Sequence, residues 1–310
     1  MTDRHVDEPA FAEATARAAT AVAGRPPERP RTAGAKVARG VSQALLAVPL
    51  IALVLWTLAP FLVTLSVSFK DRAEVFANPS LIPAAPTLDA YREVLSSESF
   101  TTSFLNSVIV GVGTTLLTLV IGVPAAYAFA RFNFRGRHLL LLFTLLPRLV
   151  PSLGLMVPIY RLAVAAGLLD KRITLIIVYT GMLLPLAVWL MVGFFQQIPR
   201  EIEEAANVDG ASLWGRLRYI VAPLAAPAMI TIGVLAFREA WNEFTLVLVL
   251  TSSPGARTLP FELYLMQGIE GIANFPGEAA FTLLTVLPFV LIYTRVERYV
   301  VAGLVSGSGK

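Results

Sequence analysis

The sequence predicts an all-α, polytopic membrane protein with six transmembrane helices. The chain of 310 residues is 56% hydrophobic and only 15% charged, whereas soluble globular domains contain about 25% charged residues. The charges are also unevenly distributed, because no Asp, Glu, Lys or Arg occurs in residues 41–69, 99–130 or 173–199. Each of these stretches exceeds the roughly 20 residues with which a helix crosses the hydrocarbon core of a bilayer. An ordinary soluble, collagenous or disordered protein is therefore excluded.

Six apolar segments account for the predicted helices. The first of these segments, Ala44–Leu65, lies too deep in the chain, and is too long, to be the core of a cleaved signal peptide. In chain order, the predicted helices are Ala44–Leu65, Phe104–Ala130, Leu139–Tyr160, Ile173–Phe195, Pro223–Leu250 and Ala279–Val301. They form one transmembrane domain, residues 41–306, between two tails. Residues 1–40 are rich in Ala, Pro and Arg and are predicted to be disordered, and residues 307–310 form the C-terminal tail.

The orientation of the helices follows from the basic residues in the connections. Sixteen Lys and Arg residues occur in the two tails, at the end of the sixth predicted helix (Arg295 and Arg298) and in the connections after the second and fourth predicted helices, whereas the opposite connections contain seven. Connections rich in Lys and Arg remain on the cytoplasmic side of a membrane. Both termini are therefore predicted to be cytoplasmic, and the connections 81–103 and 251–278 to face outward.

The composition excludes several kinds of chemistry. Cysteine is absent and only two histidines occur, so disulfide bonds, thiol catalysis and a histidine-rich metal centre are not expected. The C-terminal residues Ser306–Lys310 resemble part of a phosphate-binding loop, but Leu304 stands where that loop requires Gly. The net charge of +4 gives no reason to expect nucleic acid as a partner. The chain itself is expected to bind no cofactor.

The connection between the fourth and fifth predicted helices, residues 199–223, differs from every other connection. Pro199 suits a first helical turn, where no N–H is needed. Three glutamates that complement the positive end of a helix dipole follow it: Glu201, Glu203 and Glu204. Asp209-Gly210 is typical of a turn, because Gly adopts positive φ without strain. Ser212 then caps a second helix that ends before Pro223. The sequence therefore predicts two short helices joined by a turn.

Part of this connection resembles a known motif. Glu204-Ala205-Ala206, followed by Asp209-Gly210-Ala211 and then by Ile220 and Pro223, is similar to the "EAA" loop of binding-protein-dependent ATP-binding-cassette (ABC) importers. The resemblance is greatest to the permeases of the carbohydrate-uptake group, which handle maltose, trehalose, other oligosaccharides or glycerol phosphate. It covers about residues 42–306 and includes Asn106-Ser107, Trp241-Asn242-Glu243-Phe244 and the segment from Arg298 to Leu304. One departure is Ala222-Pro223, where relatives usually have Leu-Pro.

The resemblance implies a type I ABC importer permease fold, with the chain acting as half of a translocation pathway for a sugar and catalysing no covalent chemistry. A coupling helix at about residues 199–215 would seat on a separate ATPase subunit. The residues implied in this contact are Glu201, Glu204, Ala205, Ala206, Asp209, Gly210 and Ala211. The alternative is an amphipathic interfacial helix without a partner.

The resemblance also implies partners and a location. The expected partners are a second, homologous permease, two ATPase subunits that bind ATP and Mg, an extracytoplasmic solute-binding protein, the sugar and membrane lipid. The expected location is the bacterial inner membrane, crossed several times.

Polar residues also occur at mid-depth of the third and fifth predicted helices. They are Arg148, Arg238, Glu239, Trp241, Asn242 and Glu243. A lone charge at the bilayer centre costs at least about 2.5 kcal/mol, so the charged side chains are expected to face the bundle interior. Glu239 and Glu243, four residues apart, are expected to share one helix face. Two roles remain open: Trp241, Asn242 and Glu243 line the solute pathway, or Arg148 or Arg238 forms a structural ion pair with a glutamate.

Two alternative functions are compatible with a membrane bundle. An ion-coupled secondary transporter needs intramembrane carboxylates, for which Glu239 and Glu243 are the candidates. Such carriers usually contain internal repeats or twelve spans, and the sequence has no convincing repeat. A membrane-embedded enzyme needs acidic clusters or histidines at a membrane face, which occur only in the 199–215 loop. Co-purification with an ATPase pair and a second permease distinguishes the importer from both.

Overall fold

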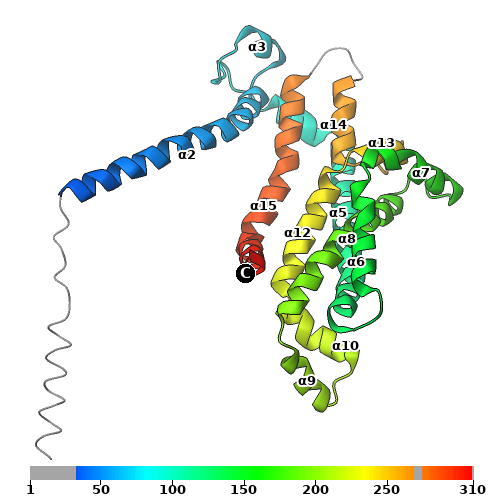
Figure 1. Ribbon diagram of the computed structural model, residues 1–310. Helices are drawn as coiled ribbons and strands as arrows, with labels where there is room; N and C mark the ends of the chain where they lie inside the picture. Colours follow the sequence, from blue (N-terminus) through cyan, green and yellow to red (C-terminus); the bar gives the residue numbers. More distant parts are fainter. Residues whose placement is uncertain (1–32, 269–273, 309–310) are drawn as a thin grey trace, which may run out of the picture. The chain divides into compact units, whose positions relative to one another are not determined.

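The computed structural model describes residues 33–268 and 274–308, in which every regular element is helical (Figure 1). Residues 1–32 of the predicted N-terminal tail and residues 309–310 of the C-terminal tail lie outside the described residues. The chain divides into two structural units, residues 1–60 and 61–310, which are described separately. The helix α2, Ala33–Ser68, crosses this division.

The described part of the first unit consists of α2 as far as Pro60. This helix begins at Ala33, so the structure places residues 33–40 in a helix and not in the predicted disordered tail. The apolar side chains from Val48 to Pro60 are exposed, with Trp56 81% exposed. A helix that is apolar around its whole circumference suits lipid or other membrane helices as its surroundings.

The second unit contains the remaining helices. After the end of α2 they are α3 (Arg72–Ala77), α4 (Asp89–Ser96), α5 (Glu98–Arg131), α6 (Arg137–Leu145), the 3₁₀ helix η1 (Leu146–Leu149), α7 (Ser152–Ala165), α8 (Arg172–Gln197), α9 (Arg200–Val208), α10 (Leu213–Arg216), the π-helix η2 (Leu217–Val221), α11 (Ala222–Leu224), α12 (Ala226–Asn242), α13 (Thr245–Leu250), α14 (Leu259–Gly268) and α15 (Phe275–Ser308).

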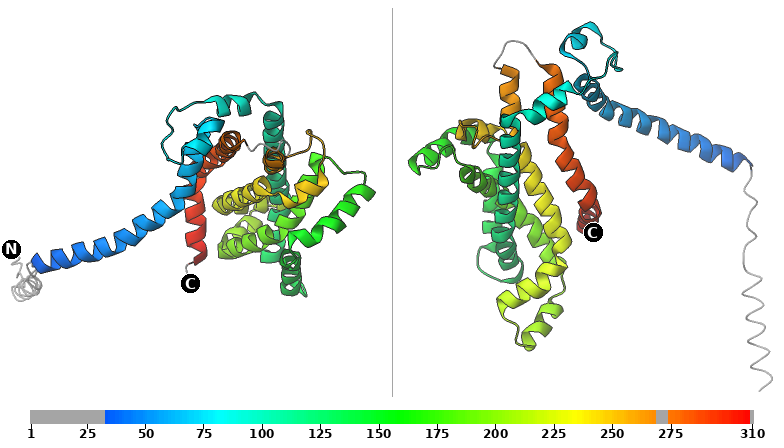
Figure 2. Two further views of the ribbon diagram at one scale, coloured as in Figure 1. Left: turned by 90° about the horizontal axis from the view of Figure 1, so that it is seen from above. Right: turned by 180° about the vertical axis from the view of Figure 1, so that it is seen from behind.

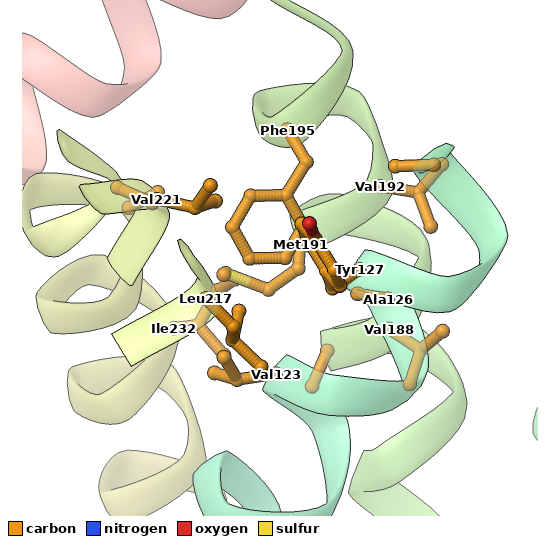
Figure 3. Close-up of a cluster of buried hydrophobic side chains, with 14 residues drawn as sticks. Val123, Ala126, Tyr127, Val188, Met191, Val192, Phe195, Leu217, Val221 and Ile232 are labelled. Atoms are coloured by element: carbon orange, nitrogen blue, oxygen red, sulfur yellow. The ribbon is translucent and has the colours of Figure 1, made fainter. Parts of the chain in front are cut away.

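The helices α5, α8 and α12 lie side by side and form the centre of the second unit (Figure 2). Glycines allow this close approach, since a Cβ atom at Gly111 would lie 2.8 Å from the ring of Phe237, and one at Gly113 would lie 2.7 Å from Ile176. Small residues have this role wherever membrane helices pack closely. Toward α9, the three helices and η2 enclose a buried apolar cluster (Figure 3).

Four helical segments are long and apolar enough to cross a membrane: Ala47–Ser68, Glu98–Arg131, Arg172–Gln197 and Phe275–Val296. Two further candidates are pairs of bent helices, and counting each pair as one span gives six among the described residues. This agrees with the six predicted spans. The last helix is longer than predicted, because α15 extends from Phe275 to Ser308.

The third predicted span, Leu139–Tyr160, is a bent pair of helices. The segments Arg137–Leu149 and Ser152–Ala165 make an angle of 96°. Val150 and Pro151 between them are extended, with ψ of 122° and 138°. A residue before proline disfavours the helical conformation, so Pro151 accounts for the break.

The fifth predicted span, Pro223–Leu250, is also interrupted. The segments Leu213–Leu224 and Ala226–Asn242 meet at 79°, and a second break separates α12 from α13. At this second break Glu243 is extended, with ψ of 123°. Glu243 is the C-terminal cap residue of α12, so the chain turns away only after it. Its side chain still lies on the same side as that of Glu239, as predicted, because both line one cavity.

Candidate functional site

The predicted pair of short helices lies at one end of the second unit, where α9 and α10 follow α8 (Figure 1). The turn between them depends on Gly210, whose φ is +84°. Its N–H donates to the carbonyl of Asn207 at 3.1 Å. At the start of α10, Ser212 Oγ accepts from the N–H of Gly215 at 3.1 Å. The predicted turn and the predicted cap are both confirmed.

The second of these helices is longer than predicted. The elements α10, η2 and α11 follow one another directly from Leu213 to Leu224, so the helical chain passes through Pro223 and does not end before it. Pro223 lies in the first turn of α11, where its missing N–H is tolerated. The wider turn of the π-helix η2 precedes it, and π-helical segments often occur at functional sites.

The residues implied in an ATPase contact lie on the surface of this loop. Glu201, Glu204, Ala205, Asp209 and Gly210 are exposed, and Ala206 and Ala211 are half-buried. Several apolar side chains lie exposed among them: Ile202, Val208, Leu213, Trp214 and Tyr219. Val208 is 87% exposed. Exposed apolar groups clustered in this way indicate a protein or membrane contact. Reasoning from the sequence missed them, because the motif draws attention to its polar and small positions.

Glu203 was also missed, although it is the buried residue of α9. Arg131 Nε donates to Glu203 Oε1 at 2.6 Å, and the hydroxyl of Tyr127 donates to Oε2 at 2.6 Å. Arg131 Nη2 also donates to the carbonyl of Ile198 at 2.9 Å. The sequence assigned Glu203 only to the helix dipole. A clue was available, since Arg131 is a basic residue on the same predicted side of the membrane.

At the break between α12 and α13, Glu243 has several hydrogen-bond partners. Its Oε2 accepts from the hydroxyl of Tyr179 at 2.6 Å and from the N–H of Val247 at 3.2 Å. Its Oε1 accepts from the N–H of Leu246 at 2.9 Å. The carboxylate thus satisfies N–H groups in the first turn of α13, which have no partner within that helix. The structure gives Glu243 a capping role that the sequence did not predict.

Three of the four predicted intramembrane charges come together around one cavity. Arg148, Glu239 and Glu243 line a cavity of about 110 Å³. Arg238 Nη1 and Glu239 Oε1 form an ion pair at 3.1 Å, one of the pairings predicted. Among the residues that the structure describes, Arg148 forms no ion pair. Its guanidinium therefore remains available at the cavity.

The two other candidates for the solute pathway lie elsewhere. Trp241 is 3% exposed, stacks on Phe237 at 5.2 Å between ring centroids and meets Phe104 edge-on at 6.0 Å. This packing favours a structural role for Trp241 over stacking against a solute. Asn242 is exposed, and its Nδ2 donates to the carbonyl of Arg238 at 2.8 Å. It therefore ends α12 with a side-chain hydrogen bond.

At the end of the bundle that lies away from α9, Asp170 binds the segment that follows α13. Its Oδ1 accepts from the N–H groups of Ser252 at 2.8 Å and Ser253 at 3.0 Å, and its φ is +59°. Burial raises the pKa of Asp170, but the hydrogen bonds from the two serines outweigh burial and lower the pKa below its ordinary value. The stabilisation is therefore present at neutral pH and is lost only as the pH falls through this lowered pKa.

The dipeptide Asn106-Ser107 holds the same segment from α5. Asn106 Nδ2 donates to the carbonyl of Pro254 at 3.1 Å and to that of Arg257 at 2.8 Å. Ser107 Oγ accepts from the N–H of Leu259 at 2.8 Å. These contacts give a structural reason for two polar residues in a span that is otherwise mostly apolar.

Replacing Asp170 with Ala is expected to expose the segment 251–258 to proteolysis. The substitution removes two hydrogen bonds to a carboxylate. A loss of about 1.4 kcal/mol raises the population of the open segment tenfold, so tryptic cleavage after Arg257 should be about tenfold faster. Asp170→Asn should give an intermediate cleavage rate, because Asn tolerates positive φ. Asp89→Ala, which removes an exposed ion pair, is the control. An unchanged rate for Asp170→Ala would contradict the assignment.

Within residues 33–268 and 274–308, no group of three or more His, Asp or Glu side chains is arranged to hold a metal ion. The fold and site together define a class: a polytopic α-helical membrane subunit that carries an exposed two-helix loop at one end. Residues 118–305 match the family described as binding-protein-dependent transport system inner membrane component. The chain belongs to this family.

Its relatives are permeases. The chain is 36% identical to the trehalose transport system permease protein SugB of Mycobacterium tuberculosis, over 82% of this chain and 93% of SugB. It is 37% identical to the sulfoquinovosyl glycerol transport system permease protein SmoH of Agrobacterium fabrum, over 82% and 89% of the two chains. It is 33% identical to the trehalose/maltose transport system permease protein MalG of Thermococcus litoralis, over 82% and 91%.

A solved structure shares the fold. A bacterial ABC transporter involved in the import of the acidic polysaccharide alginate matches with a TM-score of 0.74 and 25% identity, covering 87% of this chain and 99% of that one. The chain is thus an ABC importer permease, a transport subunit rather than an enzyme. This assignment replaces the alternatives of an ion-coupled transporter and a membrane enzyme.

Proposed function

We propose that this chain forms one half of the inner-membrane pathway of a sugar importer and that α9 with the following turn is its docking point for an ATPase. The substrate class is supported by relatives whose names specify trehalose, trehalose/maltose and sulfoquinovosyl glycerol. The proposal includes an orientation with both termini in the cytoplasm. It is supported by the distribution of Lys and Arg, since basic connections remain cytoplasmic.

The single observation that carries the docking proposal is the surface of the 199–215 loop. Its acidic residues, its small residues and apolar side chains such as Val208 and Trp214 are exposed together. Desolvated apolar anchors supply most of the energy of a protein interface, and charges at its rim set orientation and specificity. ATP and Mg would be bound by the ATPase subunits, and this chain would contribute only the docking surface.

The cavity around Arg148 and Glu239 is the part of this chain that we assign to the solute pathway. Its guanidinium and carboxylate groups donate to and accept from hydroxyl groups, respectively, which suits a polyhydroxylated solute. The cavity is small, about 110 Å³, so we propose that a second permease completes the pathway. A solute-binding protein outside the membrane would deliver the sugar, in keeping with the family's description.

Affinity purification of this chain from its native membrane tests the proposal. The expected result is a complex with two ATPase subunits and a distinct second permease. Neutral disaccharides presented with the cognate solute-binding protein should stimulate its ATP hydrolysis. Glu204→Lys should reduce recovery of the ATPase, because the substitution reverses a charge on the exposed face of α9. Glu93→Lys, in an exposed ion pair with Arg72 elsewhere, is the matched control. Recovery of the chain without any ATPase would overturn the docking proposal.

A further inference from the structure

The attachment of α9 to the rest of the chain is unusual. A short helix at the edge of a bundle is normally held by apolar side chains on its inner face. In α9 the buried side chain is a carboxylate, that of Glu203, and its neighbours along the helix are exposed or half-buried. The position of α9 therefore depends on the partners of Glu203.

These partners come from α5 and bind both oxygens of the carboxylate. Arg131 Nε and the hydroxyl of Tyr127 each lie 2.6 Å from one oxygen of Glu203. The side chains of Arg131 and Glu203 are 9% and 8% exposed. Charge-assisted hydrogen bonds of this length, shielded from water, are stronger and more directional than neutral ones. Tyr127 and Arg131 are one helical turn apart, so the contact extends along α5.

Arg131 also binds the end of α8. Its Nη2 donates at 2.9 Å to the carbonyl of Ile198, the residue at the C-terminal cap of that helix. One guanidinium therefore connects the last turns of α5 and α8 with α9. Lys can replace it only in part, because an ammonium on a flexible stem keeps the charge but lacks the rigid fork of donors that reaches two acceptors at fixed angles.

The ring of Tyr127 extends this connection into the bundle. It meets Phe195 of α8 edge-on, with the ring centroids 6.0 Å apart, inside the buried cluster drawn in Figure 3. The cluster includes Leu217 and Val221 of η2, so both ends of the α9–α11 segment are attached to the same pair of helices. Close-packed interiors transmit displacement rather than absorb it.

We propose that Arg131 and Tyr127 are positioning residues that make α9 and the adjoining ends of α5 and α8 one mechanical unit. The proposal rests on the docking of α9 on an ATPase. A displacement of α9 by that subunit then moves α5 and α8 with it, in either direction, because an ion pair resists pulling as well as pushing. Without the guanidinium, α9 still docks and ATP is still hydrolysed, but the movement is not passed to the membrane helices.

The test uses the assembled transporter in proteoliposomes and measures ATP hydrolysis and solute uptake in the same preparation. For Arg131→Met we expect retained assembly and about a tenfold fall in solute taken up per ATP hydrolysed, because Glu203 is left as an uncompensated buried charge. Arg131→Lys and Tyr127→Phe should give smaller falls. The double exchange Arg131→Glu with Glu203→Arg should restore part of the solute uptake per ATP hydrolysed. Arg135→Met, an exposed arginine in the next loop, is the control.

A second measurement does not depend on the solute or on correct folding of the strongest variant. The chain has no cysteine, so spin labels attached at Asn133→Cys, in the loop two residues after α5, and at Asn207→Cys, in α9, report the distance between these two segments. We expect the same narrow distance distribution in the nucleotide-free and ATP-trapped complexes, and a broader one in Tyr127→Phe.

The outcomes separate this proposal from the function on which it rests. A wild-type distance that changes between the two nucleotide states would overturn the mechanical unit, as would an unchanged uptake-to-hydrolysis ratio in Arg131→Met. Failure of the ATPase to bind the wild-type chain would instead overturn the docking proposal. Transport of a different class of solute would leave the inference about Arg131 intact.

Discussion

Gly210→Pro is expected to abolish ATP-driven uptake and to prevent recovery of the ATPase with the permease. Proline fixes φ near −65° and removes the N–H group, whereas Gly210 has a φ of +84° and donates to the carbonyl of Asn207. A proline in a helix interior, where it also loses a backbone hydrogen bond and clashes, costs about 3 kcal/mol or more. A similar cost at Gly210 would reduce the dockable conformation by about a hundredfold, at about 1.4 kcal/mol per factor of ten. Uptake assays and co-purification with the ATPase measure the two effects.

A matched variant at the same position separates backbone conformation from side-chain volume. A Cβ atom at Gly210 would meet no atom within 4 Å, so space is not limiting. Asn tolerates the left-handed conformation better than other residues with a side chain, and Gly210→Asn should retain most uptake. Equal loss in both variants would show that the side chain itself obstructs the interface. Normal assembly and uptake in Gly210→Pro would contradict the role assigned to the turn.

Glu243→Ala is expected to lower the free energy of unfolding by about 3 kcal/mol, because the hydroxyl of Tyr179 and two N–H groups of α13 lose their acceptor and each buried unsatisfied group costs about 1–3 kcal/mol. Glu243→Gln keeps one carbonyl oxygen as an acceptor and should cost less. Thermal unfolding of the purified permease in detergent measures the difference. Glu93→Ala, which removes an exposed ion pair, should change stability by no more than about 1 kcal/mol.

The same variants decide between the two roles left open for Glu243. If the carboxylate only holds the break between α12 and α13, Glu243→Gln should show uptake that falls in parallel with its stability. A Glu243→Gln protein that is stable and assembles normally, yet has a raised KM for uptake, would instead place the carboxylate on the solute pathway.

The sequence was sufficient to predict the features that depend on local chemistry. The gaps between charged residues located the first, second and fourth membrane helices, because hydrocarbon excludes charge over a fixed length. Asp209-Gly210 and Ser212 located the turn and cap of the exposed loop, because each residue type satisfies a local backbone requirement.

The features that the sequence did not reveal depend on contacts between distant segments. Nothing near Glu203 distinguishes it from Glu201 or Glu204, and only the position of Arg131 on α5 makes it a buried partner. The break at Glu243 contains no proline or glycine, so no local signal interrupts the apparent helix. Trp241 occupies a position that suits either a cavity or a core, and its stacking on Phe237 is a result of tertiary packing.

Uptake of a radiolabelled disaccharide into proteoliposomes tests the central claim most directly. The vesicles would contain the full complex, with this chain, its partner permease and the ATPase subunits, and the solute-binding protein would be added outside. Uptake should require ATP inside the vesicles and the binding protein outside, should be insensitive to proton and sodium gradients, and should be lost in Gly210→Pro. Uptake driven by an ion gradient without ATP would contradict the assignment of this chain as a permease that works through an ATPase docked on α9.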